Sequence, residues 1–302
     1  MKTIVFDRFG GPEVLHESET NTPEPGAGQV RIRVKAAGVN PLDGKIRSGA
    51  LEAVFPTPLP AVPGLEIAGV VDALGEGVDL VAVGDHVLGW ADTGGYAEYA
   101  LAGTVARKPG ALSWEQAATL PVAGEAAESG LRMLDIAQGE TVLIHGAAGA
   151  VGTLAVQLAA ARGARVIATA GRGNQGYLAS LGAVPTVYGD GLVERVRALA
   201  PEGIDAVFDV AGKSALRDSI ELRGGTDRIV TIADFTAGQL GITFAAGPQE
   251  RSASHLAALA EQAAKGDLVT TVAATYPLAE AATAQQISDA GHVRGKLVLT
   301  VA

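Results

Sequence analysis

The sequence has 302 residues, a formal net charge of -10 at pH 7 and 48% hydrophobic residues, which leaves room for two domains with full cores. It has no cluster of Lys and Arg, so a sequence-independent contact with nucleic-acid phosphates is not expected. It has no cysteine, which excludes disulfides, thiolate nucleophiles and cysteine-ligated zinc. No apolar run approaches the length of a membrane span, and we expect a cytoplasmic protein without a membrane contact.

The first part of the chain, residues 1–113, is rich in predicted strands. Apolar or alternating runs predict strands at 3–6, 29–35, 66–71 and 85–88, and prolines punctuate the loops between them. The run at 29–35 alternates polar and apolar residues, which is typical of a half-buried strand. We expect a small, irregular β domain.

A different pattern begins at Ser113. Ser113 with Gln116 three residues later predicts a capped helix start. Strands then alternate with helices, which predicts a parallel sheet covered on both faces, in a domain spanning 114–247. The predicted strands lie at 142–144, 165–170, 186–188, 204–210, 228–233 and 242–244, and the helices at 153–161, 174–181, 193–200 and 214–222.

The last segment, 248–302, predicts a helix at 254–265, a strand at 269–275, a helix at 278–290 and a terminal strand at 296–301. The pattern alone leaves open whether this segment joins the second domain or folds back onto the first.

A glycine-rich turn between strand 142–144 and helix 153–161 is the most specific motif. The expected glycine positions fall at Ala147, Gly149 and Gly152, so the first is alanine. Such a turn directs backbone N–H groups and a helix N-terminus at one point, which suits a pyrophosphate. It predicts dinucleotide binding, with a purely structural turn as the alternative. The expected cofactor contacts are Ala148, Gly149, Ala150, Val151 and Gly152, together with Val210 and Ala233 at the ends of two later strands.

The residues after the second strand of this domain favour NADPH over NADH. NAD-specific units usually place a carboxylate about 20 residues past the glycine turn. Here that position holds Gly171 and Arg172, with no carboxylate between Val166 and Tyr177. The Arg172 guanidinium is well shaped to pair with a 2′-phosphate, and the alternative is a solvated loop charge.

Several short motifs in order give the chain a recognisable resemblance. Besides the glycine turn, the motifs are Ala-Ala-Gly-Val-Asn-Pro-Leu-Asp at 36–43, the segments 63–71, 83–87 and 94–99, and the closing segment 291–299. The chain resembles the medium-chain dehydrogenase/reductase superfamily, in particular its zinc-free, zeta-crystallin-like quinone oxidoreductase branch. The resemblance implies an α/β fold. In it, a Rossmann dinucleotide-binding domain is inserted in a GroES-like, mainly β catalytic domain, which residues 248–302 complete.

The resemblance also shows which residues of this chain stand at the zinc-ligand positions of related dehydrogenases. Zinc-dependent relatives carry a Cys where this chain has Asn40 and a His where it has Leu65, and the cysteine-rich structural zinc loop is missing. Zinc sites need three or four N, S or O ligands. The implied chemistry proceeds without a metal, which suits quinones and enones better than simple alcohols.

Two polar residues are candidates for the reaction itself. By the resemblance, Asn40 faces the nicotinamide and its amide orients cofactor or substrate, with a loop-capping Asn as the alternative. Tyr96 is a candidate proton donor or part of an aromatic slot, with a buried packing residue as the alternative.

Further residues are expected around substrate and cofactor. Asp43, Trp90 and Phe235 are candidate substrate contacts, and an ion pair with a nearby Lys or Arg is the alternative for Asp43. Gly44 stands where related reductases often carry a large aromatic residue, which implies a wider pocket. Lys296 is expected to contact the cofactor phosphates, with a domain-closing salt bridge as the alternative.

An acidic pair at 125–128 departs from the family. Relatives commonly read Gly-Leu-Thr-Ala here, and this chain has Ala126 at the Thr position. Glu125 and Glu128 are three residues apart and would share a helix face. Paired carboxylates can raise one pKa and create a general acid, so both are catalytic candidates, and the alternative is a solvated helix face.

These features predict an NADPH-dependent, zinc-independent reductase that transfers hydride to a quinone or an α,β-unsaturated carbonyl. One alternative keeps the fold and makes it a tailoring enzyme of secondary metabolism, an enoyl reductase or a non-redox cyclase, using Glu125 and Glu128. Another is a non-catalytic NADPH-binding sensor. The apolar segment 241–244 at a predicted sheet edge favours a homodimer.

Overall fold

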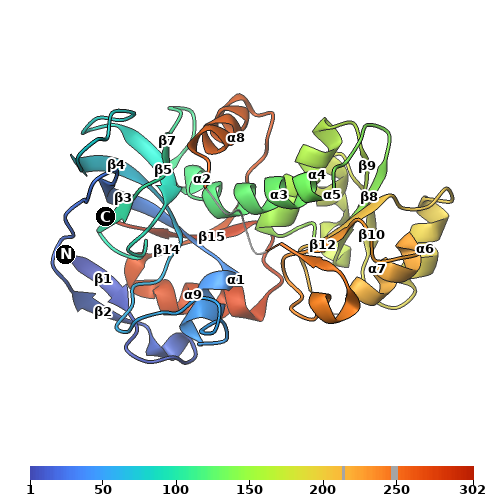
Figure 1. Ribbon diagram of the computed structural model, residues 1–302, viewed down its shortest axis with the longest axis horizontal. Helices are drawn as coiled ribbons and strands as arrows, with labels where there is room; N and C mark the ends of the chain where they lie inside the picture. The colour runs from blue at the N-terminus through green and yellow to red at the C-terminus, as the bar shows by residue number, and fades with distance from the viewer. Residues whose placement is uncertain (213–214, 246–250) are drawn as a thin grey trace. The chain divides into compact units, whose positions relative to one another are not determined.

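The structure, a computed structural model, describes residues 1–212, 215–245 and 251–302. The chain divides into two compact units (Figure 1). Unit 1 contains Met1–Val122, Arg251–Asp267 and Thr271–Ala302, and unit 2 contains Ala123–Glu250 and Leu268–Thr270. The first border expected from the sequence, after residue 113, lies before the short helix α2 (Trp114–Ala117), which belongs to unit 1. The second, at 247/248, lies outside the described residues.

Unit 1 is built on a seven-stranded sheet with strand order β14-β15-β3-β4-β5-β7, in which β6 also pairs with β3. The C-terminal strand β15 runs antiparallel to β3, with Leu297 opposite Val39, so the C-terminal segment completes unit 1. A separate two-stranded ladder joins β1 (Lys2–Val5) and β2 (His16–Glu19). The strands of the large sheet are β3 (Val30–Val39), β4 (Glu66–Leu74), β5 (His86–Trp90), β6 (Tyr99–Ala102), β7 (Val105–Arg107), β14 (Val272–Pro277) and β15 (Lys296–Thr300).

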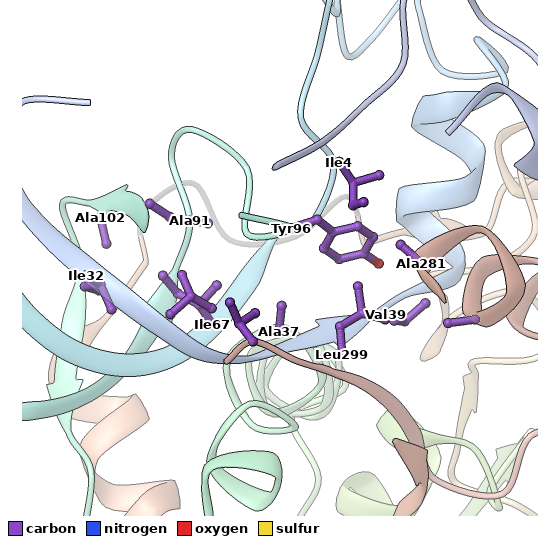
Figure 2. Packing of buried hydrophobic residues seen from close by; sticks show 14 of the residues in the cluster. Ile4, Ile32, Ala37, Val39, Ile67, Ala91, Tyr96, Ala102, Ala281 and Leu299 are labelled. Atoms are coloured by element: carbon purple, nitrogen blue, oxygen red, sulfur yellow. The ribbon is translucent and has the colours of Figure 1, made fainter. Parts of the chain in front are cut away.

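The core of unit 1 explains the alternation seen at the start of β3. Val30, Ile32 and Val34 are buried, whereas Arg33 between them is exposed. The Tyr96 ring lies among Ile4, Val39 and Ala281 in this core (Figure 2). Helices α1 (Pro41–Arg47), α8 (Ala253–Lys265) and α9 (Ala281–Ala290) complete the unit. The sequence predicted a loop where α1 begins, because Pro41 reads as a breaker, although proline is favoured at the first helical position.

The predicted capping box at Ser113 is confirmed. The Ser113 hydroxyl oxygen accepts from the Gln116 backbone N–H at 3.1 Å, and the Ser113 backbone N–H donates to Gln116 Oε1 at 3.0 Å. These bonds satisfy two helix-end donors and hold the start of α2.

Ser113→Ala is expected to lower the free energy of unfolding by about 1 kcal/mol, since one helix-end N–H loses its acceptor. Urea unfolding of the variant and the parent measures the loss. Ser113→Asp keeps an acceptor and should retain most of the stability, and an equal loss in both variants would contradict a capping role.

Unit 2 contains a six-stranded parallel sheet with strand order β10-β9-β8-β11-β12-β13. The chain proceeds outward from β8 to β10 and then returns to the other side of β8 with β11, so the strand order reverses there. In such sheets the carboxyl ends beside the reversal point form the ligand site. The strands are β8 (Thr141–His145), β9 (Arg165–Ala170), β10 (Val184–Val187), β11 (Ala206–Asp209), β12 (Ile229–Thr231) and β13 (Thr243–Phe244).

Helices pack on both faces of this sheet. Neighbouring residues of β8 and β11 point to opposite faces, with Leu143 beside Val207 and Ile144 beside Phe208. Leu143 and Val207 belong to the cluster formed with α6 and α7. A Cβ on Gly130 of α3 would lie 2.2 Å from the Phe208 ring, so α3 packs on the other face. The helices are α3 (Pro121–Met133), α4 (Ala150–Ala161), α5 (Gln175–Ser180), α6 (Leu192–Leu199) and α7 (Ala215–Arg223).

Two expectations from the sequence about unit 2 are not tested by the structure. Ser214, the expected first residue of helix α7, lies outside the described residues. The short strand β13 forms one edge of the six-stranded sheet within the described ranges, where the sequence expects a second copy to pair. That pairing stays a prediction.

Candidate functional site

The glycine turn follows β8 at the carboxyl edge of the unit 2 sheet. Gly146 has φ +69, a left-handed conformation that favours glycine. A Cβ on Gly152 would lie 2.4 Å from the Gly146 carbonyl oxygen, so this glycine lets α4 pack closely on the turn. Gly149 is the N-cap of α4, and a Cβ there would meet nothing closer than 3.5 Å. The turn therefore leaves open space in front of the α4 N-terminus, which fits a pyrophosphate.

The alanine at the first glycine position fits the same turn. Ala147 is fully buried, and its backbone N–H donates to the Thr169 carbonyl oxygen at 3.0 Å. Its methyl group packs inward and leaves the outer side of the turn open. Of the other expected contacts in the turn, Ala148 is buried, and Ala150 and Val151 are half-buried in the first turn of α4.

The other expected cofactor residues lie along the same sheet edge. Gly171 and Arg172 directly follow β9, Val210 follows β11, and Ala233 lies two residues after β12. Arg172 is exposed and has no hydrogen bond or ion pair with any residue that the structure describes. The glycine turn, the segment 171–172 and two further strand ends thus lie along the carboxyl edge of one sheet, where dinucleotides bind in such folds.

A pocket of about 540 Å³ lies at this end of unit 2. It includes Ala233 and Phe235, two of the residues expected at the site. The Phe235 side chain is 56% exposed and stacks on Phe244 with ring centroids 5.1 Å apart. The remaining lining residues are Leu216, Arg217, Asp234, Thr236 and Leu240.

Two buried polar residues hold this edge in place, and Asp209 was not among the residues expected from the sequence. Asp209 Oδ1 accepts from the backbone N–H groups of Ala211 and Gly212, both at 3.0 Å, and Oδ2 accepts from the Thr231 hydroxyl at 2.7 Å. Burial raises the pKa of its carboxyl. In the sequence, Asp209 could have been recognised because it is a carboxylate at the carboxyl end of an apolar strand. The His145 ring bonds to the Thr169 hydroxyl at 3.2 Å and to the Ser219 hydroxyl at 3.1 Å, and burial lowers its pKa to about 4, so the ring is neutral.

Unit 1 contains a buried polar cluster at the end of β3. We call Asn40, Glu66 and Lys296 the amide cluster; they are 5%, 0% and 3% exposed. The Lys296 ammonium donates to Asn40 Oδ1 and pairs with Glu66 Oε1. Asn40 Nδ2 donates to the same Glu66 oxygen at 2.9 Å, and Glu66 Oε2 accepts from the Val122 backbone N–H at 2.8 Å. A Cβ on Gly38 would lie 2.3 Å from Glu66 Oε1, so a glycine in β3 makes room for the carboxylate.

The amide cluster changes the role expected for Lys296. The sequence placed its ammonium at the cofactor phosphates or in a domain-closing salt bridge. In the structure the ammonium is buried and paired with Glu66 inside unit 1, so we reassign Lys296 to the amide cluster. Asn40 is the N-cap residue of α1, but its side chain bonds to Glu66 and Lys296.

A second buried group, formed by Asp43 and Tyr96, adjoins Asn40. Asp43 Oδ2 accepts from the Asn40 backbone N–H at 2.8 Å and from the Tyr96 hydroxyl at 3.2 Å. Burial raises the pKa of Asp43 to about 7, although the Asn40 bond and the Lys296 charge lower it. Burial and the Asp43 charge raise the pKa of Tyr96 well above its ordinary value.

This arrangement corrects two expectations. The Tyr96 side chain is fully buried, so it packs in the core and does not line an aromatic slot or face a substrate (Figure 2). Asp43 bonds to a backbone N–H and a phenol, whereas the sequence offered an ion pair with Lys or Arg. Asp43 is buried, as Asn40 is, and its contact with a substrate stays a prediction.

Two further expectations about the pocket differ from the structure. Trp90 is 4% exposed, and the Arg251 guanidinium lies 5.6 Å from its ring centroid, so the ring is covered within unit 1. A Cβ on Gly44 would lie 2.2 Å from Asp289 Oδ1. The carboxylate of α9 therefore fills the space that a missing aromatic side chain was expected to leave open.

The acidic pair on α3 is divided between two environments. Glu125 is buried, whereas Glu128 is half-exposed and its Oε1 accepts from Arg162 Nη2 at 2.5 Å. Because Glu125 is buried and Glu128 is bonded to Arg162, the two carboxylates do not form one shared acidic face, and the structure does not support the pair acting together.

The positions of the zinc ligands in related dehydrogenases do not fit a metal here. Leu65 offers no donor atom, and the Asn40 amide oxygen already accepts from the Lys296 ammonium. Across residues 1–212, 215–245 and 251–302, no group of three or more His, Cys, Asp or Glu residues could hold a metal ion. Over the same ranges, no helix has the length and apolar character needed to cross a membrane.

Comparison with known proteins gives the same class as the fold. The profile of the alcohol dehydrogenase GroES-like domain matches residues 26–109, and that of a zinc-binding dehydrogenase domain matches residues 181–299. The chain belongs to the medium-chain dehydrogenase/reductase superfamily, and it is an oxidoreductase with a fold that binds a nicotinamide dinucleotide.

Within this superfamily, the chain is similar to reductases of quinones and of alkenals or alkenones. The quinone oxidoreductase of Lama guanicoe is 32% identical, over 99% of this chain and 97% of that protein. A solved quinone oxidoreductase from Coxiella burnetii is 35% identical with a TM-score of 0.88, covering 100% of this chain and 99% of that one. The NADPH-dependent alkenal/one oxidoreductase of Arabidopsis thaliana chloroplasts is 37% identical over 70% of this chain and 58% of that protein.

Proposed function

We propose that this protein is an NADPH-dependent reductase that transfers hydride, without zinc, to a quinone or an α,β-unsaturated carbonyl. The observation that carries the proposal is the similarity to quinone oxidoreductases over the whole chain, in a protein with Asn40 and Leu65 at the zinc positions. Because the donor set does not suit zinc, the acceptor has to accept hydride readily, as quinones and enones do.

Unit 2 supplies the cofactor site in this proposal. The N-terminus of α4 binds the pyrophosphate through backbone N–H groups, and Gly149 leaves the space for it. The exposed Arg172 guanidinium pairs with the 2′-phosphate. When bound, the reduced nicotinamide supplies the hydride.

Unit 1 supplies the polar group that acts on the acceptor. Asn40 donates a hydrogen bond to the acceptor oxygen, which gains negative charge as the hydride arrives. Solvent then provides the proton, because Tyr96 is buried and Glu128 is paired. Most of the rate enhancement comes from holding the two reactants in place.

Reduced nicotinamide absorbance, followed with a panel of quinones and enones, tests this function. We expect NADPH to be oxidised at a rate that depends on both enzyme and acceptor. Acceptor turnover without NADPH oxidation would contradict the proposal and favour the non-redox alternative. Tight NADPH binding without turnover of any acceptor would favour a sensor.

Arg172→Ala is expected to raise the Kd for NADPH by about 10- to 100-fold, because one ionic hydrogen bond of about 1.5–3 kcal/mol is lost. The Kd for NADH should stay nearly unchanged, since NADH lacks the 2′-phosphate. Fluorescence titration measures both constants. Arg197→Ala on α6, which removes an arginine paired with Glu221, is the matched control. Equal weakening of NADPH and NADH would show that Arg172 does not contact the 2′-phosphate.

A further inference from the structure

We infer that Lys296 and Glu66 are positioning residues that fix the Asn40 side-chain amide so that it presents one N–H donor, and that this donor acts on the substrate oxygen. The inference rests on the proposed function, because it describes how the acting group of that same site is held. It assigns roles to two charged residues that need not touch cofactor or substrate.

The amide cluster forms a closed ring of contacts. The Lys296 ammonium contacts both Asn40 Oδ1 and Glu66 Oε1, and the same Glu66 oxygen accepts from Asn40 Nδ2. Both partners therefore lie along one edge of the planar amide. The N–H bonded to Glu66 is then the one on the same side as the amide oxygen.

This ring leaves one kind of polar group available on Asn40. A primary amide has two N–H donors and one carbonyl acceptor. One donor and the acceptor face the Lys296–Glu66 pair, so the second N–H points away from it.

The backbone of Asn40 is held as firmly as its side chain. Its N–H donates to Asp43 Oδ2 at 2.8 Å, and the residue is the N-cap of α1. Partners on β4, on β15 and on α1 therefore converge on one neutral residue. Because the backbone and the side chain of Asn40 are both held, its free N–H can position a substrate atom without a further loss of conformational entropy.

The choice of a carboxylate at position 66 follows from the number of donors around it. Glu66 accepts from Lys296, from Asn40 Nδ2 and, through its other oxygen, from the Val122 backbone N–H. A glutamine would place an NH₂ group against one of these donors. A buried ion pair adds little stability compared with apolar residues of similar volume, so its presence here points to positioning.

The single donor also restricts the substrate. An N–H stabilises an oxygen that gains negative charge, such as the oxygen of a quinone or an enone. An N–H cannot accept the hydroxyl proton that an alcohol has to lose when it is oxidised. The site therefore suits carbonyl acceptors and disfavours alcohol oxidation.

Three variants separate positioning from stability: Lys296→Met, Glu66→Gln and the double variant. Each single variant leaves a buried group unpaired and should lower both thermal stability and kcat. In the double variant no unpaired charge remains, so part of the lost stability should return, although the glutamine NH₂ still faces one of the two remaining donors. The kcat should stay about 100-fold below the parent, as for loss of one oxyanion donor, and the NADPH Kd should stay within about threefold. Recovery of kcat together with stability would overturn the inference, because it would show a purely structural role.

The pair Arg228–Glu140 in unit 2 offers a matched control. Arg228 Nη1 and Nη2 bind the two Glu140 oxygens at 2.6 and 2.7 Å, next to the amino ends of β12 and β8. The double variant Arg228→Met with Glu140→Gln removes a partly exposed ion pair at the sheet edge opposite the glycine turn. Its kcat should equal that of the parent.

The two Asn40 amide protons provide a readout that needs no turnover. In protein labelled with ¹⁵N-asparagine, the signals missing in Asn40→Asp identify them. One proton should exchange slowly and the other fast, and the Lys296→Met, Glu66→Gln double variant should lose the difference. Equal exchange in the parent would overturn the positioning. If the parent exchanges as expected but oxidises no NADPH with any acceptor, the proposed function and the donor's role in it fall, and the held geometry stands.

Discussion

Gly149→Glu is expected to weaken NADPH binding by at least about 100-fold, or ~3 kcal/mol, while the protein stays folded. Gly149 is the N-cap of α4, in front of the helix end that we assign to the pyrophosphate. A carboxylate there would occupy the anion position and repel the cofactor phosphates. NADPH fluorescence titration measures the loss.

The fold should tolerate this substitution for reasons that the structure gives. Gly149 has φ -74 and ψ 176, an extended conformation open to any residue, and a Cβ there would meet no atom closer than 3.5 Å. A negative charge also stabilises a helix N-terminus. Thermal unfolding should therefore be unchanged. Gly110→Glu, at an exposed position of unit 1 with nothing within 4 Å of its Cβ, adds the same charge and should bind NADPH normally. An undiminished titration of Gly149→Glu would refute the assignment of the turn.

The features predicted correctly from the sequence are those encoded over short distances along the chain. The glycine turn lies within a few residues of its strand and helix, and the Ser113–Gln116 cap spans a single helical turn. Both depend on backbone conformation and nearby donors, which local residue types determine. The absence of a carboxylate around Arg172 is local in the same way.

The amide cluster could not be predicted by the same reasoning, because its members are distant in sequence. Asn40 is 26 residues from Glu66 and 256 residues from Lys296. Only the pairing of β15 with β3 and of β3 with β4 brings them together. Pattern analysis placed Lys296 correctly at the start of a strand but could not find its partner. A glycine inside β3, at Gly38, was a usable signal of a large group packed against the backbone.

The other differences between prediction and structure concern aromatic side chains that are buried in the core. Tyr96 and Trp90 have polar atoms and aromatic rings, which suit both a pocket and a core. Their positions in the sequence do not show which side of the sheet is covered. In the structure the Tyr96 hydroxyl has a partner in Asp43, so a polar atom enters the core without losing its hydrogen bond.

Asp43→Asn is expected to stabilise the protein at pH 8 by on the order of 4 kcal/mol. Burial raises the pKa of Asp43 from 3.8 to about 7, so the folded protein binds this proton more tightly than the unfolded chain does. Stability from this group is therefore full below about pH 4 and is lost as the pH rises through about 7. An asparagine resembles the protonated form. Its carbonyl oxygen can accept from Asn40 N–H and Tyr96 hydroxyl, and its NH₂ takes the place of the unpartnered Oδ1.

The difference between variant and parent isolates Asp43 from the other titrating groups. Glu66 and Lys296 act on its pKa in opposite directions and are present in both proteins. Urea unfolding from pH 4 to pH 8 should give a difference that grows with pH and levels off above about pH 7. Asp79→Asn, an exposed carboxylate in the loop between β4 and β5, removes the same charge and should show no such growth. A pH-independent difference for Asp43→Asn would show that the Asp43 carboxyl is already ionised in the folded core, with Lys296 compensating its charge.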